Sequence, residues 1–550
     1  MPFSSPFPPL DIPKVDLLSY IFPPSSTPSD TPIWIDAKNP QHSLSPRQLL
    51  QWTKRLGYGL DGLGIKRGDA VVIFTPNHIF VPVVYFGVVG TGRVFSGLNP
   101  NYTASEAAHQ LQNTEAKVVL VHPSLVGTAI KAAKQINFPR NRLYLFSDHR
   151  NNAVHGIKDW RSLTGSFEQG ERYTWHRMNE KEAETTLATL NYSSGTTGRP
   201  KGVAISHYNI VANIEQTIFM RFLHKKTRRQ ERWLGFLPLY HAYAQLYTIV
   251  MAVKLHIPVY LMKEFHFEDF LRAIQAYKIT NLQVAPPILV MLNKRPETTK
   301  YDLTSVTDVL CGAAPLSSEL QNKVAGRFNL QINQGWGMTE TVCGAHHVPG
   351  GTKDDSGSVG QLFPNCECKL LDDNGNEVAP GQPGEMYIRG PQVCMGYWKN
   401  KKATKEALSP DGWLRTGDVA IVRDGWFWIV DRKKELIKVN GLQVAPAELE
   451  AVLLEFNQIA DAAVVGITIN GEEWPRAYIH LEDCAKGRIK ESDIQNYMQT
   501  KVAKHKQLVG GISFIDEVPK LPSGKIVRKM LKEWSKRDAL ALEENYRAKL

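Results

Sequence analysis

Short apolar runs alternate with helix-length segments between Asp69 and Leu310. The strand-like runs cover residues 70–74, 117–122, 143–146, 259–261 and 282–285. Strands that alternate with helices are typical of layered α/β folds, in which neighbouring strands pair in parallel. The pattern therefore predicts a large α/β body in the N-terminal part of the chain.

The pattern changes after Gly357, where short strands and tight turns dominate. One predicted hairpin joins residues 368–371 to 385–389 through a turn that contains Asn374-Gly375, and a second covers 420–430 and turns at Asp424-Gly425. Asn-Gly and Asp-Gly between apolar runs are strong hairpin signals. We expect a small β-rich unit attached to the α/β body.

A charged run, Asp431-Arg432-Lys433-Lys434-Glu435, follows the second hairpin, and a new pattern begins after it. Residues 449–455 are predicted to form a helix, and residues 462–467 and 477–481 strands. We place a domain boundary near Lys434. The expected fold class is therefore α/β, with a large N-terminal body of layered subdomains at residues 1–433 and a small, mobile α+β domain at 434–550.

Residues 79–94 are apolar but shorter than the ~20 residues that a membrane-spanning helix needs. Pro82 and several glycines also interrupt them, so a buried helix is expected and no transmembrane segment. The first 32 residues are rich in Pro and Ser and lack a charged stretch followed by an apolar one, which argues against a secretory signal. Hydrophobic residues make up 43% of the chain, as in ordinary globular proteins.

The chain carries 65 Lys and Arg against 54 Asp and Glu, a net charge of +11. A basic surface attracts polyanions, which include nucleotides and coenzyme A as well as nucleic acid. No nucleic-acid-binding motif accompanies the charge, so nucleic acid is not an expected partner. The six cysteines are too few for a disulfide framework and indicate a reducing compartment. Cys366 and Cys368 lack a nearby second pair, which argues against a metal site there.

The strongest chemical signal is the stretch Tyr192-Ser193-Ser194-Gly195-Thr196-Thr197-Gly198-Arg199-Pro200-Lys201-Gly202. Glycines and small hydroxyl residues let backbone N–H groups approach phosphates, and Lys201 adds a positive charge. The spacing differs from that of the Walker A loop. Such a stretch can also be a plain surface loop, but its composition favours phosphate binding.

At this loop the chain resembles the adenylate-forming superfamily of acyl-CoA ligases, luciferases and peptide-synthetase adenylation domains, and most closely its 4-coumarate–CoA ligase-like branch. The resemblance covers about Asp36 to Lys532. Further family motifs follow in order: Leu237-Pro238-Leu239-Tyr240-His241, Gly312-Ala313-Ala314-Pro315-Leu316, Gln334-Gly335-Trp336-Gly337-Met338-Thr339-Glu340, Thr416-Gly417-Asp418, Asp431-Arg432-Lys433-Lys434-Glu435 and Pro522-Ser523-Gly524-Lys525.

The resemblance implies an ATP site, and each motif also has a physical interpretation. Trp336 between two glycines offers a flat face to a purine, although a core aromatic looks the same in the sequence. Asp418 can accept both ribose hydroxyls with Arg432 beside it, although most Gly-Asp pairs are turns. By resemblance, nucleotide contacts also fall on Ser193, Ser194, Gly195, Thr196, Thr197, Gly198, Lys201, Gly312, Ala313, Ala314, Gln334, Gly335, Gly337, Thr339, Lys438 and Gly441.

Mg²⁺ is expected on Glu340 and Thr196, because this cation prefers oxygen ligands and binds through few carboxylates together with phosphates. By resemblance, Lys525 enters the active site from the C-terminal domain and stabilises the negative charge that develops as the carboxylate attacks ATP. Lys434 is the expected hinge, and Gly441 and Gln443 belong to the loop that replaces Lys525 when coenzyme A reacts. His241 is expected to orient the carboxylate, although a lone histidine is more often structural.

The resemblance implies activation of a small carboxylic acid as an acyl-adenylate, followed by transfer to the thiol of coenzyme A. The acid pocket is expected to include His241, Tyr243, Tyr247, Gly312, Gly337 and Cys343. Tyr247 and Cys343-Gly344 depart from the coumarate enzymes, so aryl-alkanoic, cinnamic-like and medium-chain fatty acids all stay open.

Three rival functions share many of these residues: an amino-acid adenylation enzyme, a luciferase-type oxidase and a non-catalytic nucleotide-binding protein. The first would need a carboxylate for the α-amine, and residues 237–241 contain none. The last would not need Lys525, Thr339, Glu340 and Asp418 together. A basic membrane-surface or nucleic-acid binder would bind in a salt-sensitive manner without ATP.

The chain ends in Ala548-Lys549-Leu550, which is similar to the peroxisomal Ser-Lys-Leu address. We expect the peroxisomal import receptor to be a partner and the peroxisome to be the location, with the cytoplasm as the alternative.

Overall fold

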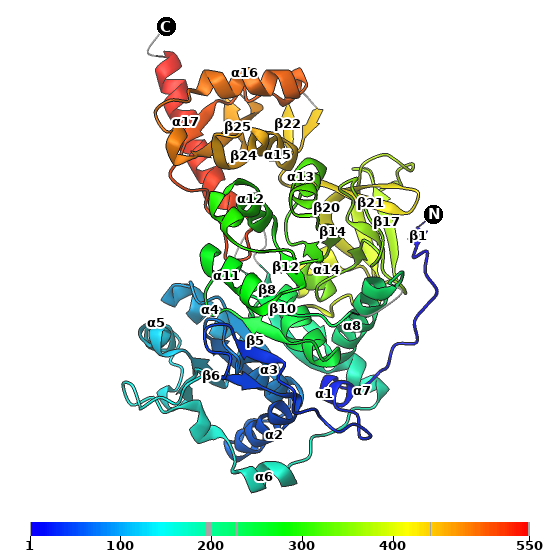
Figure 1. The fold of residues 1–550 in the computed structure, drawn as a ribbon, viewed down its shortest axis with the longest axis vertical. Helices are drawn as coiled ribbons and strands as arrows, with labels where there is room; N and C mark the ends of the chain where they lie inside the picture. The colour runs from blue at the N-terminus through cyan, green and yellow to red at the C-terminus, as the bar shows by residue number, and fades with distance from the viewer. Residues whose placement is uncertain (1, 194–199, 226–228, 440–441, 470, 548–550) are drawn as a thin grey trace.

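The computed structural model describes residues 2–193, 200–225, 229–439, 442–469 and 471–547. Figure 1 shows a large N-terminal body and, at one end of the long axis, a smaller C-terminal unit coloured orange to red. Two sheets of 14 and seven strands organise the body, and sheets of two and three strands form the C-terminal unit. The α/β class expected from the sequence is confirmed.

The seven-stranded sheet has the order β19-β9-β8-β5-β4-β6-β7. Its strands β5, β4, β6 and β7 are parallel, as the alternating pattern predicts. The strands are β4 (Ala70–Phe74), β5 (Val94–Leu98), β6 (Val118–Val121), β7 (Leu143–Leu145), β8 (Leu187–Ser193), β9 (Lys201–Ser206) and β19 (Gly396–Tyr397). Helices α2 (Pro46–Gly62), α3 (Val81–Val89), α4 (Ala104–Thr114) and α5 (Val126–Gln135) lie among them (Figure 1).

The apolar stretch at residues 79–94 contains the buried helix that the sequence predicts. All nine residues of α3 are buried. Among the helices of the described residues, none is both long and apolar enough to cross a bilayer.

The 14-stranded sheet has a parallel half and an antiparallel half. The parallel half consists of β14 (Gln331–Trp336), β13 (Asp308–Cys311), β12 (Asn281–Val284), β10 (Trp233–Gly235), β11 (Val259–Leu261) and β2 (Trp34–Asp36), with β3 (Ser43–Leu44) antiparallel at its edge. Its helices include α11 (Phe267–Tyr277), α12 (Pro286–Lys294) and α13 (Ser318–Phe328). This half places the loops after β12, β13 and β14 at one edge, as in other parallel sheets.

The antiparallel half contains the predicted hairpins and continues the parallel half through the β14–β15 pair. Its strands are β1 (Phe3–Ser4), β15 (His346–His347), β16 (Gly360–Leu362), β17 (Glu367–Leu371), β18 (Gly384–Arg389), β20 (Leu414–Arg423) and β21 (Trp426–Arg432). The β20–β21 turn has positive φ at Asp424 and Gly425, 50° and 79°, which explains the Asp-Gly pair. The β-rich unit is therefore an extension of the main sheet, not a separate sheet.

The C-terminal unit has its own hydrophobic core, to which Leu449, Val464, Ile479 and Ile494 contribute. Its elements are β22 (Ile437–Val439), β23 (Leu442–Val444), α15 (Pro446–Glu455), β24 (Ile459–Ile469), β25 (Glu472–Leu481), α16 (Glu491–Lys501), β26 (Ile512–Phe514) and α17 (Arg528–Arg547). Three of them, α15, β24 and β25, match the predicted helix and strands. Arg432 ends β21 and Ile437 begins β22, so Lys434 lies in the short connection between body and C-terminal unit.

The remaining helices of the described residues range from single turns to the 16-residue α8. They are α1 (Leu17–Ile21), α6 (Phe167–Arg172), α7 (Glu180–Thr185), α8 (His207–Phe222), α9 (Ala242–Ala244), the π-helix η4 (Gln245–Met251), α10 (Ala252–Lys254), α14 (Lys401–Ala407), and the 3₁₀ turns η1 (Pro123–Leu125), η2 (Arg140–Arg142), η3 (Trp160–Leu163), η5 (Pro296–Lys300), η6 (Thr339–Thr341), η7 (Asp483–Ala485) and η8 (Lys504–Lys506).

Candidate active site

One polar cluster lies on interior strands of the 14-stranded sheet and consists of Trp336, Asp418 and Arg432. Trp336 ends β14, while Asp418 and Arg432 lie opposite each other on β20 and β21. The Trp336 indole donates from Nε1 to Asp418 Oδ2 at 2.9 Å, and Arg432 Nε lies 3.3 Å from Asp418 Oδ1. The three motifs that the sequence associates with a nucleoside therefore meet in space.

Asp418 has an unused hydrogen-bond acceptor. The side chain is buried, and its Oδ1 has no hydrogen-bond partner although Arg432 is nearby. Burial raises the pKa of Asp418, and the Arg432 charge and the Trp336 hydrogen bond oppose this rise. A buried acceptor without a donor costs about 1–3 kcal/mol, so this atom suits a hydroxyl donor such as a ribose oxygen.

Lys525 reaches the same cluster from the C-terminal unit. Its loop is closed by hydrogen bonds from Leu521 N to Lys525 O and from Gly524 N to Leu521 O, both of 2.8 Å. Gly524 has φ of +83°, and a Cβ there would lie 3.1 Å from Ala285 Cβ and 3.2 Å from Pro287 Cγ. Glycine thus lets the loop dock against the start of α12.

The electrostatic neighbours of Lys525 come from both parts of the chain. Burial lowers the pKa of Lys525, and the positive charge of Arg432 lowers it further, whereas Asp418 and Glu340 raise it. Lys525 therefore lies among two carboxylates and one guanidinium. A lysine in this position can stabilise negative charge on a reacting group.

Glu340 is a buried carboxylate held by two hydroxyl groups. Tyr397 donates to Glu340 Oε1 at 2.8 Å and Ser193 donates to the same atom at 3.2 Å. Lys201 Nζ lies 5.0 Å from the centre of the Tyr397 ring. Ser193 and Lys201 flank the glycine-rich loop, so the oxygen donor Glu340 lies at the loop's base, where its chemistry fits Mg²⁺.

Tyr397 is a site residue that the sequence did not point to. It lies on β19, which pairs with β9 directly after the glycine-rich loop. An isolated Gly396-Tyr397 pair carries no chemical signal. Only the strand pairing places its hydroxyl on Glu340.

His241 caps α9, where its Nδ1 accepts from Tyr243 N at 3.4 Å. Burial, with the Lys525 charge, lowers the pKa of His241 to about 3. The imidazole is therefore neutral at physiological pH and can orient a carboxylate but adds no positive charge. His241 and Thr339 also line a cavity of about 20 Å³, which has room for one water molecule.

The predicted acid pocket brings Tyr243, Tyr247 and Cys343 together. The two tyrosine rings meet edge to face, 5.3 Å between centroids, and Tyr243 donates to Leu310 O at 3.0 Å. Tyr247 lies on the π-helix η4, a distortion that is frequent at functional sites. Burial raises the pKa of Cys343 to about 12, so its thiol stays protonated. The side chain therefore serves to line the pocket and not as a nucleophile.

A strained turn shapes the pocket wall between Gly337 and Gly344. Val342 has φ of 62° and ψ of −58°, and Cys343 N donates to Thr341 O at 2.7 Å, which defines a γ-turn. A Cβ at Gly337 would lie 1.6 Å from Cys343 O. Glycine at 337 is therefore required by the close approach of this turn.

The segment Gly312-Ala313-Ala314 follows β13, with positive φ of 71° at Ala313. Gly312 lies beside Gly335 and Tyr243, because a Cβ at Gly312 would be 3.5 Å from Gly335 O and 3.8 Å from the Tyr243 ring. The Gln334 amide donates to Leu316 O at 3.1 Å and Gln321 Oε1 at 2.7 Å. The Gln334 side chain thus holds the segment after β13 in place.

Several predicted residues lie apart from this cluster. Lys438 and Gln443 are paired across the β22–β23 hairpin, which packs on β25 and η8, and both side chains are exposed. Lys434 is exposed as well. Ser194, Gly195, Thr196, Thr197, Gly198 and Gly441 lie outside the described residues.

Two family profiles match the chain. The profile of the AMP-binding enzyme family matches residues 24–398, and that of the AMP-binding enzyme C-terminal domain matches residues 448–525. The chain is 35% identical to phenylacetyl-CoA ligase epaB of Aspergillus niger over 96% of this chain and 98% of that protein. It is 34% identical to peroxisomal OPC-8:0-CoA ligase 1 of Arabidopsis thaliana over 90% and 89% of the two chains. The chain belongs to the AMP-binding, adenylate-forming enzyme family.

A solved structure shows the same fold. The anthranilate CoA ligase AuaEII in complex with anthranoyl-AMP superposes with a TM-score of 0.83, at 22% identity, over 96% of this chain and 99% of that one. The architecture expected from the sequence resemblance is thereby confirmed.

Proposed function

We propose that this chain is an ATP-dependent acid–CoA ligase that acts on an aryl-alkanoic acid. The observation that carries the proposal is the position of Lys525, which the C-terminal loop inserts among Asp418, Glu340 and Arg432. A protein that only bound a nucleotide would not need a half-buried lysine at this point. Membership of the family and its acyl-CoA ligase relatives support the same activity.

In the first step, a carboxylate oxygen of the acid bonds to the α-phosphorus of ATP, and pyrophosphate leaves with the electron pair of the broken P–O bond. Asp418 accepts from the ribose through Oδ1, which makes no hydrogen bond within the protein, and Trp336 and Arg432 hold that carboxylate in place. Lys525 stabilises the charge on the α-phosphate and carboxylate oxygens. Glu340, together with phosphate oxygens, would hold Mg²⁺, which supplies charge neutralisation.

In the second step, the coenzyme A sulfur bonds to the acyl carbon and AMP leaves. The C-terminal unit must rotate about Lys434 for this step, because Lys438 and Gln443 lie on an exposed hairpin away from the cluster. We therefore place the described conformation at the adenylation step. Exclusion of water from the closed site protects the acyl-adenylate from hydrolysis.

The choice of an aryl-alkanoic acid is supported by the walls of the pocket. Tyr243 donates from its hydroxyl to Leu310 O, and its ring meets the Tyr247 ring edge to face, so the two rings form one aromatic surface. Edge-to-face contacts favour an aromatic acid by about 0.5–1.5 kcal/mol over an aliphatic one. Residues 237–241 offer no carboxylate to an α-amine, which disfavours amino acids.

The test is a panel of acids with purified protein and Mg·ATP. Pyrophosphate and thioester are measured with phenylacetic, cinnamic, medium-chain fatty and amino acids, with and without coenzyme A. We expect phenylacetic-type acids to give the highest kcat/KM and a thioester product. Preference for a fatty acid would contradict the acid class, whereas pyrophosphate without thioester would contradict the ligase.

We also propose that Ala548-Lys549-Leu550, which lie outside the described residues, address the protein to the peroxisome. The support is the match to the tripeptide signal and the peroxisomal relative in Arabidopsis thaliana. A fluorescent protein fused in front of the full chain should co-localise with a peroxisomal marker. Leu550→Asp should return it to the cytoplasm, and a cytoplasmic wild-type fusion would contradict the proposal.

A further inference from the structure

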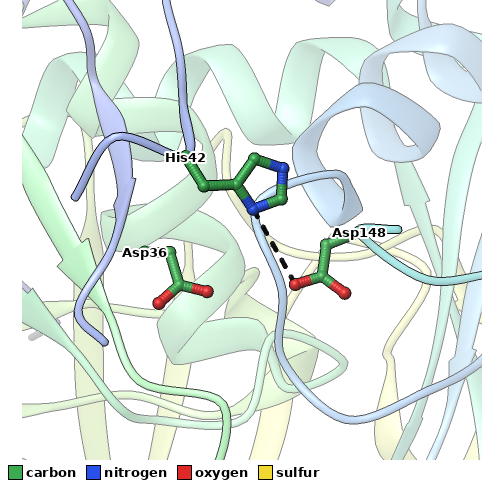
Figure 2. Close-up of side chains that lie close together, drawn as sticks. All are labelled: Asp36, His42 and Asp148. Atoms are coloured by element: carbon green, nitrogen blue, oxygen red, sulfur yellow. Dashed lines mark ion pairs between the residues drawn. The ribbon is translucent and has the colours of Figure 1, made fainter. Parts of the chain in front are cut away.

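Three potential metal ligands converge at a second place, remote in the sequence from every residue assigned to the active site. One ligand atom from each of Asp36, His42 and Asp148 lies within 4.8 Å of the other two. Figure 2 shows the His42 ring between the two carboxylates, with a ring nitrogen directed at Asp148. His42 Nδ1 is 4.0 Å from Asp148 Oδ2.

Asp36 and His42 are held by the turn between β2 and β3. Asp36 N donates to His42 O at 2.9 Å, and His42 N donates to Asn39 O at 2.8 Å. Asp36 Oδ1 accepts from Lys38 N at 2.7 Å and Asn39 N at 2.9 Å. These bonds fix the Asp36 carboxylate at the end of β2 before any ion binds.

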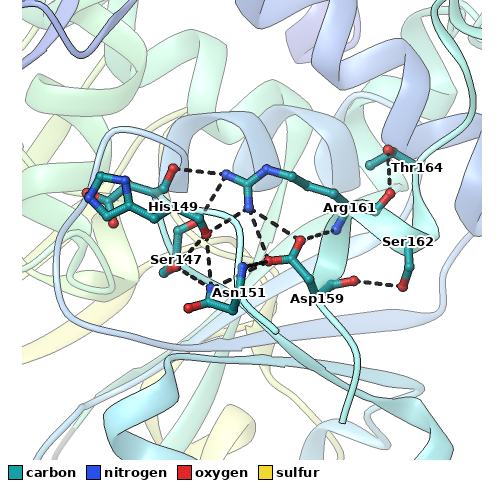
Figure 3. A network of polar contacts seen from close by, with 8 residues as sticks. Ser147, His149, Asn151, Asp159, Arg161, Ser162 and Thr164 are labelled. Atoms are coloured by element: carbon teal, nitrogen blue, oxygen red, sulfur yellow. Dashed lines mark hydrogen bonds and ion pairs between the residues drawn. The ribbon is translucent and has the colours of Figure 1, made fainter. Parts of the chain in front are cut away.

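Asp148 lies on the loop after β7, and the Arg161 side chain is hydrogen-bonded to that loop (Figure 3). The Arg161 guanidinium donates to the carbonyls of Asp148 at 2.9 Å and His149 at 3.0 Å. Asp159 completes the brace, because it accepts from Asn151 N at 2.8 Å. A ligand whose main chain is hydrogen-bonded in this way is preorganised, as in built metal sites.

The buried side chain of His78 has a ring nitrogen without a hydrogen-bond partner. Its side chain is 4% exposed, its Nδ1 accepts from Phe80 N at 3.3 Å, and its Nε2 has no hydrogen-bond partner. The His78 ring packs on Phe146, two residues before Asp148, at 4.5 Å between centroids. Because Nδ1 accepts a hydrogen bond, Nε2 carries the proton of a neutral ring and is a donor without an acceptor.

Other charged groups also face the cluster. His149 Nε2 is 3.8 Å from Asp148 Oδ2, and its ring stacks on His42 at 5.3 Å. The exposed Lys263 ammonium also interacts electrostatically with Asp148, and His122 interacts with both of them. Lys263 is exposed, and its long side chain can turn to solvent.

We propose that Asp36, His42 and Asp148 bind a divalent transition-metal ion, Zn²⁺ in the first instance. One imidazole nitrogen and two carboxylate oxygens form a donor set that Zn²⁺ accepts, with a water molecule in the fourth position. The three atoms need to approach by about 1 Å to reach ordinary Zn²⁺ coordination, a change within the freedom of side-chain rotation. The ion ties β2 of the 14-stranded sheet to the loop after β7 of the seven-stranded sheet.

The test is a Zn²⁺ titration of the full chain without nucleotide at neutral pH, followed by calorimetry. The background is Cys484→Ser, because Cys484 is an exposed thiol that could bind Zn²⁺ by itself. We expect one ion per chain and a rise in Tm with Zn²⁺. Asp148→Asn and His42→Ala should each weaken binding at least about tenfold and abolish the rise in Tm.

His176→Ala is the matched control, because His176 also faces a carboxylate, Glu182, at 3.0 Å on the surface. It should bind Zn²⁺ like the parent protein. Melting in EDTA shows whether each variant is folded, and Asp36→Asn replaces any variant that is not. Binding that is unchanged in the ligand variants, or absent at about 100 µM Zn²⁺, overturns the proposal.

Discussion

At the scale of single residues, the contact between Trp336 and Asp418 makes a sharp prediction. Trp336→Phe keeps an aromatic face for the base but removes the indole N–H that donates to Asp418. A hydrogen bond to a charged group contributes about 1.5–3 kcal/mol, so KM for ATP should rise at least about tenfold. Trp428→Phe also loses an indole hydrogen bond, to Ser356 O, and should leave KM unchanged. An unchanged KM in Trp336→Phe would contradict the nucleoside site.

The pH dependence of the first step follows from the surroundings of Lys525. Burial and Arg432 lower the pKa of Lys525 below its ordinary 10.5, and the reaction needs the protonated form. The kcat/KM for pyrophosphate release should therefore fall as pH rises through that lowered pKa. Arg432→Gln removes a neighbouring positive charge, so this alkaline limb should move to higher pH.

Lys433→Gln is the control for Arg432→Gln, because Lys433 is paired with Asp373 and Glu385 instead. Its pH profile should match that of the wild type. A limb that stays in place or moves to lower pH in Arg432→Gln would show that Lys525 does not control it.

The family resemblance carried by the motifs predicted the meeting of Trp336, Asp418, Arg432 and Lys525, whereas the residue types alone left structural alternatives open. The sequence could not show that Tyr397 holds Glu340, since that contact depends on the pairing of β19 with β9. The sequence also could not show toward which partner a side chain points. Gln334 belongs to a nucleotide motif, yet its amide is used within the protein.

At the scale of elements, the turn between Gly337 and Gly344 shows how backbone geometry sets a sequence requirement. Gly337→Ala would place its methyl group 1.6 Å from Cys343 O. Such overpacking against backbone should lower the free energy of unfolding by about 3 kcal/mol, as measured by urea denaturation.

Gly326 on α13 is the matched control, because nothing lies within 4 Å of an added Cβ there. Gly326→Ala should leave the free energy of unfolding equal or raise it by up to about 1 kcal/mol. Equal stability of both alanine variants would contradict the close approach at Gly337.

Strand and hairpin positions were predictable where the local pattern is strong, as at β4, β11 and the Asp424-Gly425 turn. The joining of the β-rich unit to the main sheet was not, because it depends on the β16–β21 pairing, in which Gly360 lies opposite Phe427, far away in the sequence. The γ-turn at Val342 was also beyond prediction. A β-branched residue is normally excluded from positive φ, and only the packing around it imposes the strain.

At the scale of the whole molecule, a few contacts hold the C-terminal unit on the body. Asp431 Oδ2 accepts from Ala447 N at 3.0 Å and so caps α15 from the other side of the connection. Lys294 on α12 donates to Ile459 O, and Gly524 packs on Ala285 and Pro287. These contacts, together with a small apolar cluster of Val419, Leu436 and Ala445 at the connection, are the packing that a rotation about Lys434 must rearrange.

Lys434→Pro tests the rotation. Proline fixes φ at residue 434, where Lys434 N donates no backbone hydrogen bond among the described residues. Pyrophosphate formation should stay within about threefold, while thioester formation from synthetic acyl-adenylate should fall about 100-fold. Lys434→Ala, which loses the side chain without restricting φ, should keep both activities. Equal retention of both activities in Lys434→Pro would contradict a hinge at this residue.

The most direct measurement follows pyrophosphate and thioester formation together in Lys525→Ala, with the best acid of the panel. We predict that pyrophosphate formation falls about 100- to 1,000-fold, while thioester formation from synthetic acyl-adenylate and coenzyme A persists. Lys529→Ala, an exposed lysine on α17, should leave both rates unchanged. If Lys525→Ala releases pyrophosphate as fast as the wild type, Lys525 does not stabilise the adenylation step and the proposed mechanism is wrong.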